Sequence, residues 1–600
     1  MPHQRRTRLH QRSDGVAVLE YDGSMVRETF ERITAPLRGF QKAAYSRIAA
    51  PIQGLHQAAY LLASLTLASQ LLALLRDRTF AHTFGAGEIL DLYYAAFRVP
   101  DLVFALVASL VSAYVLIPRI TGMERESTRR LLSESATFLF GVGGLICVVL
   151  AVFMPQFLAF LYPSFAASPH QADFVLLARM LLLQPILLGL SGVLASVLQV
   201  HRRFVLFAIS PVLYNLGIIL GTVYLYPLWG LPGIGAGVIV GAIAYLAVNL
   251  PVIVNTGVFP SFRLPSISLM LPVIRDSIPR SLALGMGSIT ALVLTALASR
   301  IGSGAISVFT FAGNLAAVPL ALIGSSYAIA AFPALSEASA VERREEFTRI
   351  LSAGARHVIL WSVVSIGLIV VLRAHIVRVI LGTGAFDWNA TRLTAALLAI
   401  LAVGLVAQGL ILLFSRALYA VRQSWRPLAY QCAGGLLTVV FALAFLALPD
   451  SGMPASLAAL LKVSDVPGTA ILLIALAATL GQIFLAILSL IALRSVSPGL
   501  ASTLSRPLVD GSIAALAGGA AAYVTLVLEG SIAPLTTLVA VFAEGLVAGV
   551  VGLSAAALAL YFVENEEFRI VTNALNKLIR VPGGSSGVLV PSAEETPPVH

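Results

Sequence analysis

One stretch decides the class of this protein: residues 70–118, which read QLLALLRDRTFAHTFGAGEILDLYYAAFRVPDLVFALVASLVSAYVLIP. The stretch is apolar enough to lie in a bilayer, yet it carries ionisable side chains at Arg76, Asp77, Arg78, Glu88, Asp91, Arg98 and Asp101. A charge at the centre of a membrane helix costs about 2.5–3.5 kcal/mol on insertion scales, so such side chains face a polar cavity or one another and mark a transport path. Asp91 and Arg98 are spaced to share one face of a helix. The alternative for Arg76 and Arg78 is that they only extend from a helix end toward water.

The composition of the whole chain extends this pattern. Of its 600 residues, 58% are hydrophobic and 11% are charged, and the mean hydropathy is +0.91. These values predict an all-α, polytopic membrane protein and not a soluble enzyme. The formal net charge is +10, but no aromatic-basic RNA motif or zinc-ligand spacing accompanies it, so no nucleic-acid partner is expected. The motifs GxxxxGK(S/T), HExxH and CxxC are absent, and we expect no nucleotide site, metal or other cofactor.

Apolar runs long enough to cross a membrane recur along the chain, at about 20 residues each. We predict fourteen spans, at residues 57–83, 88–118, 131–154, 173–200, 204–225, 232–256, 271–298, 304–334, 350–372, 391–421, 427–447, 468–492, 511–528 and 534–562. Several exceed a minimal span, which is typical of tilted or bent helices.

The distribution of basic residues predicts the orientation of these spans. Lys and Arg favour short cytoplasmic loops, and seventeen lie in the loops and span ends that we place inside, against five outside: Arg300, Arg373, Arg378, Arg392 and Lys462. We therefore predict a protein of the cytoplasmic membrane with both termini in the cytoplasm. The predicted divisions are a basic segment at 1–55, an N-terminal lobe at 56–256, a C-terminal lobe at 257–500, two further spans at 501–565 and a tail at 566–600.

Weak internal repetition supports the two lobes. GAGEILDLYYAAF at 85–97 is similar to GSGAISVFTFAGN at 302–314, and LASVLQVHRRFVLF at 194–207 is similar to SRALYAVRQSWRPL at 415–428. Both members of each pair have the same predicted orientation, which indicates parallel repeats about an axis normal to the membrane.

Several of these motifs, in this order and spacing, also carry a resemblance. FGAGEILDLYYAAFRVPDL, LYPSF, SPVLYNLGIILG, GTGAFDWNATRLTAALLAI and SRALYAVRQSWRP resemble the MurJ/MviN family of bacterial lipid II flippases, within the superfamily of multidrug, oligosaccharidyl-lipid and polysaccharide exporters. The resemblance covers about residues 57–500. It implies a V-shaped pair of six-helix lobes, two additional C-terminal helices and a cationic central cavity that moves lipid II to the outer leaflet by alternating access.

The resemblance also implies site residues. Arg76 and Arg98 match basic positions of the family's cavity, and Asp91 matches its acidic position on the second helix. A lipid diphosphate suits such a cavity because Arg makes bidentate contacts with phosphate. The chain departs from the family pattern where the family has charged residues, at Gln70, Phe104, Ala105, Ser109 and Asn314.

We predict a substrate-binding set of Arg76, Asp91, Arg98, Asp101, Arg280 and Asn314. Arg280 follows Pro279 near the start of the seventh span and would supply the cation that is missing at Asn314. Asp387, in GAFD at 384–387, is expected to cap the tenth span. His375 is expected to be a solvated side chain of the preceding outer loop.

Three functions stay open at this point. The first is flipping of lipid II, with cell-wall synthesis proteins as candidate partners. The second is export of another polyprenyl-linked saccharide or of a drug-like cation, for which Asp91 and Asp101 would be the binding carboxylates. The third is a non-transporting scaffold that acts through residues 1–55. No carboxylate lies in the spans at 427–447 and 468–492, so we expect a proton or the membrane potential to drive transport rather than sodium.

Overall fold

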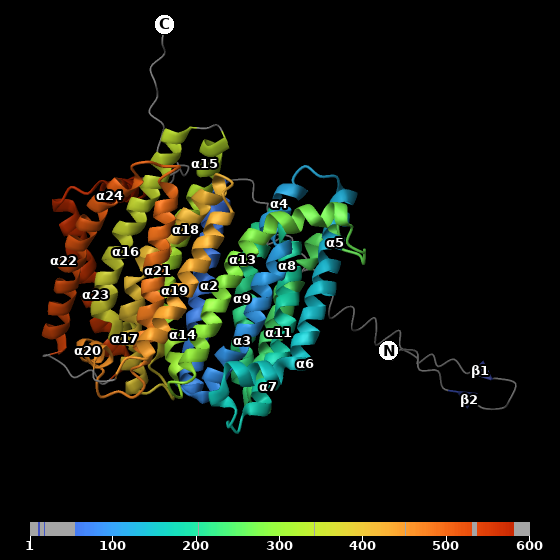
Figure 1. Cartoon of the computed structure of the whole chain (residues 1–600), viewed down its shortest axis with the longest axis horizontal. Helices are drawn as coiled ribbons and strands as arrows, with labels where there is room; N and C mark the ends of the chain where they lie inside the picture. Colours follow the sequence, from blue (N-terminus) through green and yellow to red (C-terminus); the bar gives the residue numbers. More distant parts are fainter. Residues whose placement is uncertain are drawn as a thin grey trace, which may run out of the picture.

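The computed structural model describes residues 10–11, 17–18, 55–201, 203–340, 343–449, 452–530 and 537–580. Long helices run side by side across the molecule (Figure 1). The predictions about most of the basic N-terminal segment and about the tail beyond residue 580 lie outside the described residues.

Residues up to 256 form the first group of elements. Its helices and turns are α2 (Leu55–Phe84), α3 (Glu88–Leu106), η1 (Ala108–Val111), α4 (Ala113–Ile120), α5 (Arg125–Phe138), η2 (Leu139–Gly143), α6 (Gly144–Leu161), η3 (Pro163–Phe165), α7 (Gln171–Leu181), α8 (Leu183–Val200), α9 (Phe204–Leu220), η4 (Gly221–Leu225), α10 (Tyr226–Trp229), α11 (Leu231–Ala247) and α12 (Leu250–Thr256). Before them, β1 (His10–Gln11) and β2 (Ala17–Val18) form an antiparallel pair.

The later residues form the second group. Its elements are α13 (Ile267–Ala298), α14 (Ala305–Leu320), η5 (Ala321–Ser325), α15 (Ser326–Ala340), α16 (Arg344–Leu381), α17 (Trp388–Val403), α18 (Leu405–Ala420), α19 (Trp425–Leu446), α20 (Met453–Leu460), α21 (Ile471–Leu493), η6 (Leu500–Thr503), α22 (Ser505–Gly530), α23 (Leu538–Phe562) and α24 (Glu566–Arg580).

The predicted class, an all-α polytopic membrane protein, is confirmed. Within the described residues, ten helices are long and apolar enough to cross a membrane, or twelve if each of two bent pairs is one span. The bends fall in the long predicted spans 88–118 and 391–421, at 40° and 45°, so these runs are long because they are bent. The count of fourteen stays a prediction: α11 has 17 residues, and α2 carries three adjacent charges at 76–78.

Glycine explains how closely two of these helices pack. A Cβ atom on Gly217 of α9 would lie 2.4 Å from the Cα atom of Gly241 on α11, and one on Gly221 would lie 2.6 Å from the Cα atom of Gly237. These distances are too short for any side chain, so the two backbones meet through small residues, as is common in membrane helices.

The ends of the bundle have different cores. We define the lower face by the connections at 85–87, 299–304 and 382–387, and the upper face by those at 121–124, 201–203 and 494–504; the names follow Figure 1. Near the lower face, one buried cluster joins both groups, from Phe80 to Val238 and from Leu294 to Ala477. Near the upper face there are two clusters, one running from Ala108 to Val273 and one from Ala328 to Leu500. The first of these upper clusters includes Met270 and Val273 of α13, so the start of α13 packs with the first half. The halves therefore share a core below, whereas above it one core belongs to the first half with the start of α13 and another to α15, α16 and α18.

Candidate functional site

The centre of the predicted site is a polar cluster on α2. The guanidinium of Arg76 donates to Asp77 Oδ1 at 2.8 and 3.0 Å and to Asn215 Oδ1, on α9, at 3.0 Å. Asn314, on α14, donates from Nδ2 to Asp77 Oδ2 at 2.8 Å. The side chain of Arg76 is 20% exposed and that of Asp77 is 3% exposed. This Arg76 cluster (Arg76, Asp77, Asn215 and Asn314) thus joins the two halves and leaves part of the Arg76 side chain accessible.

Arg98 and Asp101 form a second polar position, on α3. Arg98 Nε donates to Thr295 Oγ1, on α13, at 2.8 Å. Asp101 lies one helical turn later and interacts electrostatically with Arg98. Both side chains are half-buried, so this pair also lies where the first half meets the second.

Arg280 does not join these residues. Its Nη1 atom donates to Ser112 Oγ at 3.3 Å, next to the start of α4. Along α13, Arg280 precedes Thr295 by about 22 Å at 1.5 Å of rise per residue. The structure therefore places Arg280 toward the upper face, away from Asn314, whose missing charge it was predicted to replace.

Asp91 is completely buried, at 0% exposure, and its acceptors are taken by protein donors. Oδ2 accepts from the backbone N–H of Gly304 at 2.7 Å, and Oδ1 accepts from the N–H and the hydroxyl of Ser307 at 2.7 and 2.5 Å. These donors belong to the first turn of α14, whose N-terminus favours a negative charge. A carboxylate of the first half therefore holds a helix terminus of the second half.

Arg78 binds the C-terminus of a helix, as Asp91 binds an N-terminus. Its Nη1 atom donates to the carbonyl oxygens of Val379 and Ile380 at 2.6 and 3.1 Å, which lie in the last turn of α16, where a cation is favoured. We call this set the lower latch: Asp91 with Gly304 and Ser307, and Arg78 with Val379 and Ile380.

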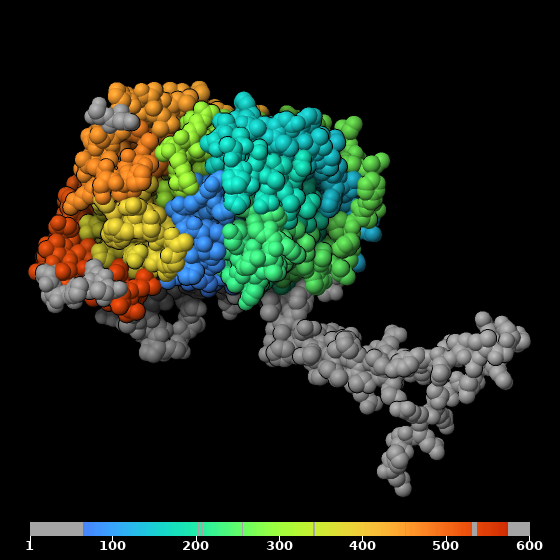
Figure 2. Space-filling view, turned by 90° about the horizontal axis from the view of Figure 1, so that it is seen from below, coloured from blue at the N-terminus to red at the C-terminus, as the bar shows by residue number. Residues whose placement is uncertain are grey.

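Backbone contacts close the lower face around the latch. The N–H of Ala385 donates to the carbonyl of His82 at 3.0 Å. A Cβ atom on Gly85 would lie 2.5 Å from the carbonyl oxygen of Ala385, and one on Gly304 would lie 2.4 Å from that of Ala86. Gly85 and Gly304 also have φ of +62° and +86°, which glycine adopts without strain. Figure 2, seen from below, shows the blue residues of α2 and α3 between the two halves.

Two smaller predictions have clear outcomes. Asp387 caps α17, because its Oδ1 atom accepts from the N–H of Ala390 at 2.7 Å, so that prediction is confirmed. His375 is not in a loop; it lies within α16, and its Nε2 atom is 3.0 Å from Glu544 Oε2 on α23. The loop prediction was wrong because α16 is longer than the apolar run that defined the span.

Sequence reasoning did not single out Asp77, Asn215, Thr295 or Arg78 as partners within the site. A polar residue in an apolar helix is a usable signal, and Asn215 stands in the quoted stretch SPVLYNLGIILG. Its partner, however, lies on another helix and only the fold identifies it. No group of three or more His, Cys, Asp or Glu side chains suited to a metal occurs in the described part of the chain.

Comparisons with known proteins agree on one family. The sequence profile described as "Lipid II flippase MurJ" matches residues 80–505. The lipid II flippase MurJ of Burkholderia cenocepacia is 27% identical over 387 residues, which cover 62% of this chain and 74% of that protein. The probable lipid II flippase MurJ of Thermotoga maritima is 26% identical over 365 residues, covering 60% and 73%.

Solved structures with the same fold include members of two transporter groups. A lipid II flippase MurJ in an inward closed conformation superposes with a TM-score of 0.66 and 18% identity, over 84% of this chain and 100% of that chain. An inward-facing multidrug resistance transporter of the MATE family, in the MOP superfamily, gives 0.58 and 16%, over 74% and 98%. At these identities the likeness concerns the fold alone.

Proposed function

The chain belongs to the MurJ family of lipid II flippases, and from this premise we propose that it carries lipid II, or a close polyprenyl-diphosphate analogue, from the cytoplasmic to the outer leaflet by alternating access. Family membership makes it a multi-pass transporter of the bacterial inner membrane and not an enzyme. What we propose is which substrate this chain carries and how that substrate crosses the membrane.

The observation that carries the proposal is the Arg76 cluster. Its guanidinium is held between the halves by Asp77 and Asn215, and the Arg76 side chain as a whole is 20% exposed. A held guanidinium can offer its free N–H groups to phosphate oxygens without first losing side-chain freedom. Arg98, fixed by Thr295, supplies a second guanidinium on the neighbouring helix. Together they suit a diphosphate head group, while the polyprenyl tail stays in the lipid.

The arrangement of cores supports alternating access. The halves, residues 56–256 and 257–500, share a core below. Above, one core joins the first half to Met270 and Val273 of α13, and another joins α15, α16 and α18, so the upper face can open between these two cores without breaking either. In the proposed topology the upper face is cytoplasmic, as the distribution of Arg and Lys favours. The described conformation is then closed to the outside by the lower latch, and transport requires the latch to open.

A complementation experiment with a binding assay tests the function. The gene should restore growth to a bacterium depleted of its own flippase, and the purified protein should bind lipid II more tightly than undecaprenyl phosphate, and both more tightly than a neutral lipid. Failure to complement despite normal membrane insertion would contradict flipping. Preference for the neutral lipid would contradict a phosphate-binding site.

One observation favours export of another polyprenyl-linked saccharide as the second candidate. Asp77 pairs with Arg76, and the residue facing it from α14 is the neutral Asn314. The cluster therefore carries less positive charge than the family pattern in the resemblance implies. Binding of a polyprenyl-monophosphate sugar in preference to lipid II would select this alternative.

A further inference from the structure

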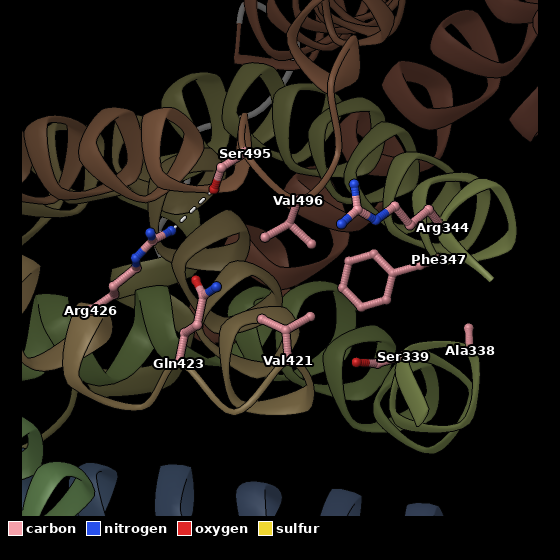
Figure 3. A pocket seen from close by; sticks show the side chains of 9 residues that line it. All are labelled: Ala338, Ser339, Arg344, Phe347, Val421, Gln423, Arg426, Ser495 and Val496. Carbon is pink, nitrogen blue, oxygen red and sulfur yellow. Dashed lines mark hydrogen bonds between the residues drawn. The ribbon is translucent and has the colours of Figure 1, made fainter. Parts of the chain in front are cut away.

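A pocket separate from the Arg76 cluster opens at the upper face of the second half. Its volume is about 610 Å³, which lies within the roughly 300–1,000 Å³ typical of small-ligand sites. Residues from the end of α15, the start of α16, the connection before α19 and the segment after α21 line it (Figure 3). We propose that this upper pocket binds a phosphate ester, either the head group of an anionic phospholipid or a soluble phosphorylated metabolite.

Two arginines give the pocket its charge. Figure 3 shows Arg344 and Arg426 on opposite sides of the space, with their guanidinium groups turned toward it. Arg426 is anchored, because its Nη1 atom donates to Ser495 Oγ at 3.2 Å and to the carbonyl of Ala492 at 3.3 Å. Arg344 has neither a hydrogen bond nor an ion pair to any other described residue, and no acidic side chain is among the described residues that line the pocket. Two unneutralised guanidinium groups across one cavity favour an anion with several oxygens.

The backbone adds to this preference. Arg344 is the first residue of α16, and Arg426 is the second residue of α19. Neither helix has a side-chain cap at its N-terminus. The first turn of α16 carries Glu345 and Glu346, whereas the first turn of α19 carries no acidic residue, so the N-terminus of α19 is the one that favours an anion. Helix N-termini of this kind attract phosphate groups.

A neutral polar group in the pocket also needs a partner. Gln423 Oε1 is shielded from solvent and has no hydrogen-bond partner. Leaving a buried polar atom unpaired costs about 1–3 kcal/mol. This oxygen lies out of reach of a ligand in the cavity, so the group that Gln423 offers to the pocket is its NH₂, which can donate to a phosphate oxygen. Phe347 and Val496 supply an apolar wall, which suits the carbon skeleton of a phosphate ester better than a bare inorganic ion.

The first half shows what happens when this position is filled by the chain itself. There α5 begins after the second predicted span, as α16 begins after the eighth. The segment before α13 covers α5: Arg263 Nη2 donates to Glu126 Oε1 at 2.9 Å, and the N–H of Ser261 donates to Ser133 Oγ at 3.0 Å. In the second half, the segment after α21 also packs on α16, through Leu500 in the buried cluster that contains Phe347, and its Ser495 and Val496 line a cavity. The second half therefore keeps a cavity beside this contact, which is a place that a ligand can take.

The test is ligand binding by the purified full-length protein, followed by its thermal unfolding. The soluble probe is glycerol 3-phosphate, added to protein in nanodiscs of phosphatidylcholine. The lipid probe is phosphatidylglycerol, included in the nanodiscs in place of part of the phosphatidylcholine. We expect one of the two to raise the unfolding temperature, and which one does so identifies the source of the phosphate ester. If neither does, the proposal is wrong.

Variants assign the effect to the pocket. Arg344→Gln should weaken binding of the effective probe at least tenfold and leave the unfolding temperature without it unchanged, because Arg344 holds no other described residue. Arg426→Gln should also weaken binding of the effective probe. It should lower the stability of the protein as well, because the contacts of Arg426 with Ala492 and Ser495 are lost. The matched control is Arg349→Gln, an exposed arginine of α16 outside the pocket lining. Equal effects of Arg344→Gln and Arg349→Gln would overturn the proposal, as would full binding in Arg344→Gln.

The upper pocket stands apart from the proposed transport function. Arg76→Ala should leave binding of the effective probe unchanged, because Arg76 lies on α2 and its cluster shares no residue with the pocket. Loss of complementation with retained probe binding would therefore separate the two sites. Loss of probe binding in Arg76→Ala would contradict a separate site.

Discussion

At the scale of single residues, the neutral side chain of Asn314 changes what the central charges do. Asn314 donates to one oxygen of Asp77 while Arg76 holds the other. Asp77 is nearly buried, and a buried carboxylate is stable only when its oxygens are hydrogen-bonded. Asn314 therefore satisfies the carboxylate without adding a second positive charge, and Arg76 stays the cation of the cluster that we propose to face the substrate.

Replacing Arg76 should abolish transport. We expect Arg76→Ala to reduce complementation by at least about tenfold, because one hydrogen bond to a charged group contributes roughly 1.5–3 kcal/mol. Arg76→Lys should restore only part of the activity, since an ammonium group cannot contact Asp77, Asn215 and a phosphate in one plane.

The measurement is growth of a flippase-depleted strain, with membrane levels of each variant checked by immunoblot. Arg275→Ala, which removes an exposed arginine of α13, is the control and should complement fully. Normal growth with Arg76→Ala at normal expression would remove Arg76 from the transport site.

At the same scale, Glu134 anchors the segment that joins the two halves. It accepts from Arg130 at 2.8 Å and from the N–H and hydroxyl of Ser266 at 2.8 and 2.7 Å, and its side chain is 2% exposed. Glu134→Ala should lower the stability by about 1–3 kcal/mol, because it leaves Ser266 donors without a partner. Thermal unfolding of the purified protein measures this loss.

Glu126 offers a matched control on the same helix. It pairs with Arg263, but its side chain is 66% exposed, and exposed ion pairs contribute at most about 1 kcal/mol. Glu126→Ala should therefore shift the unfolding temperature less than Glu134→Ala. A larger shift for Glu126→Ala would show that burial does not decide the strength of this anchor.

At the scale of secondary structure, helix ends connect the two halves. The N-terminus of α14 is held by Asp91 and the C-terminus of α16 by Arg78, and each charge has the sign that the helix dipole favours. Both contacts bind helix ends rather than loops, so releasing them removes two direct ties between the halves at the lower face. This makes the lower latch a suitable gate.

Removing Asp91 should open the lower face. The loss of its hydrogen bonds weakens the closed state by at least roughly 1.5–3 kcal/mol, which shifts a two-state population by more than tenfold. A suitable reporter is Ala305→Cys, at the first residue of α14 and 5% exposed, in a chain with Cys147 and Cys432 replaced by Ser.

A membrane-impermeant thiol reagent should leave this reporter unlabelled in the otherwise unchanged protein and label it after Asp91→Ala. Glu88→Ala, which removes another acidic residue from the first turn of α3, is the control and should leave it protected. Equal protection in Asp91→Ala would exclude the latch as a gate.

At the scale of the whole molecule, the distribution of cores relates the fold to its movement. A shared core near the lower face resists separation there, because apolar surface of both halves would be exposed to water. Near the upper face there are two separate cores, one of the first half with the start of α13 and one of α15, α16 and α18, so separation between them exposes less apolar surface. The helices α22 and α23 pack on α16 through a further cluster around Leu360 and Ala514 and would move with the second half.

The proposed orientation can be measured directly with two exposed alanines at opposite ends of the bundle. Ala167 lies between α6 and α7 at the lower end, and Ala501 lies in η6 at the upper end. With the native cysteines replaced by Ser, Ala167→Cys should react with an impermeant reagent in intact cells, and Ala501→Cys should react only after the cells are opened. The reverse pattern would show that the upper face is external and would invert the proposed direction of access.

The sequence by itself determined the class, the approximate spans, the family resemblance and the presence of ionisable residues in apolar helices. These follow from hydropathy and short motifs, which are properties of neighbouring residues. It could not determine the roles of those ionisable residues, because a carboxylate can be satisfied by a substrate, a neighbour or a helix end. Asp91 finds its partner 213 residues away at Gly304, and Arg280 lies far along α13 from the cluster that it was predicted to complete. Only the tertiary structure decides such pairings, since they depend on which helix ends and side chains the packing of the two halves brings within hydrogen-bond distance.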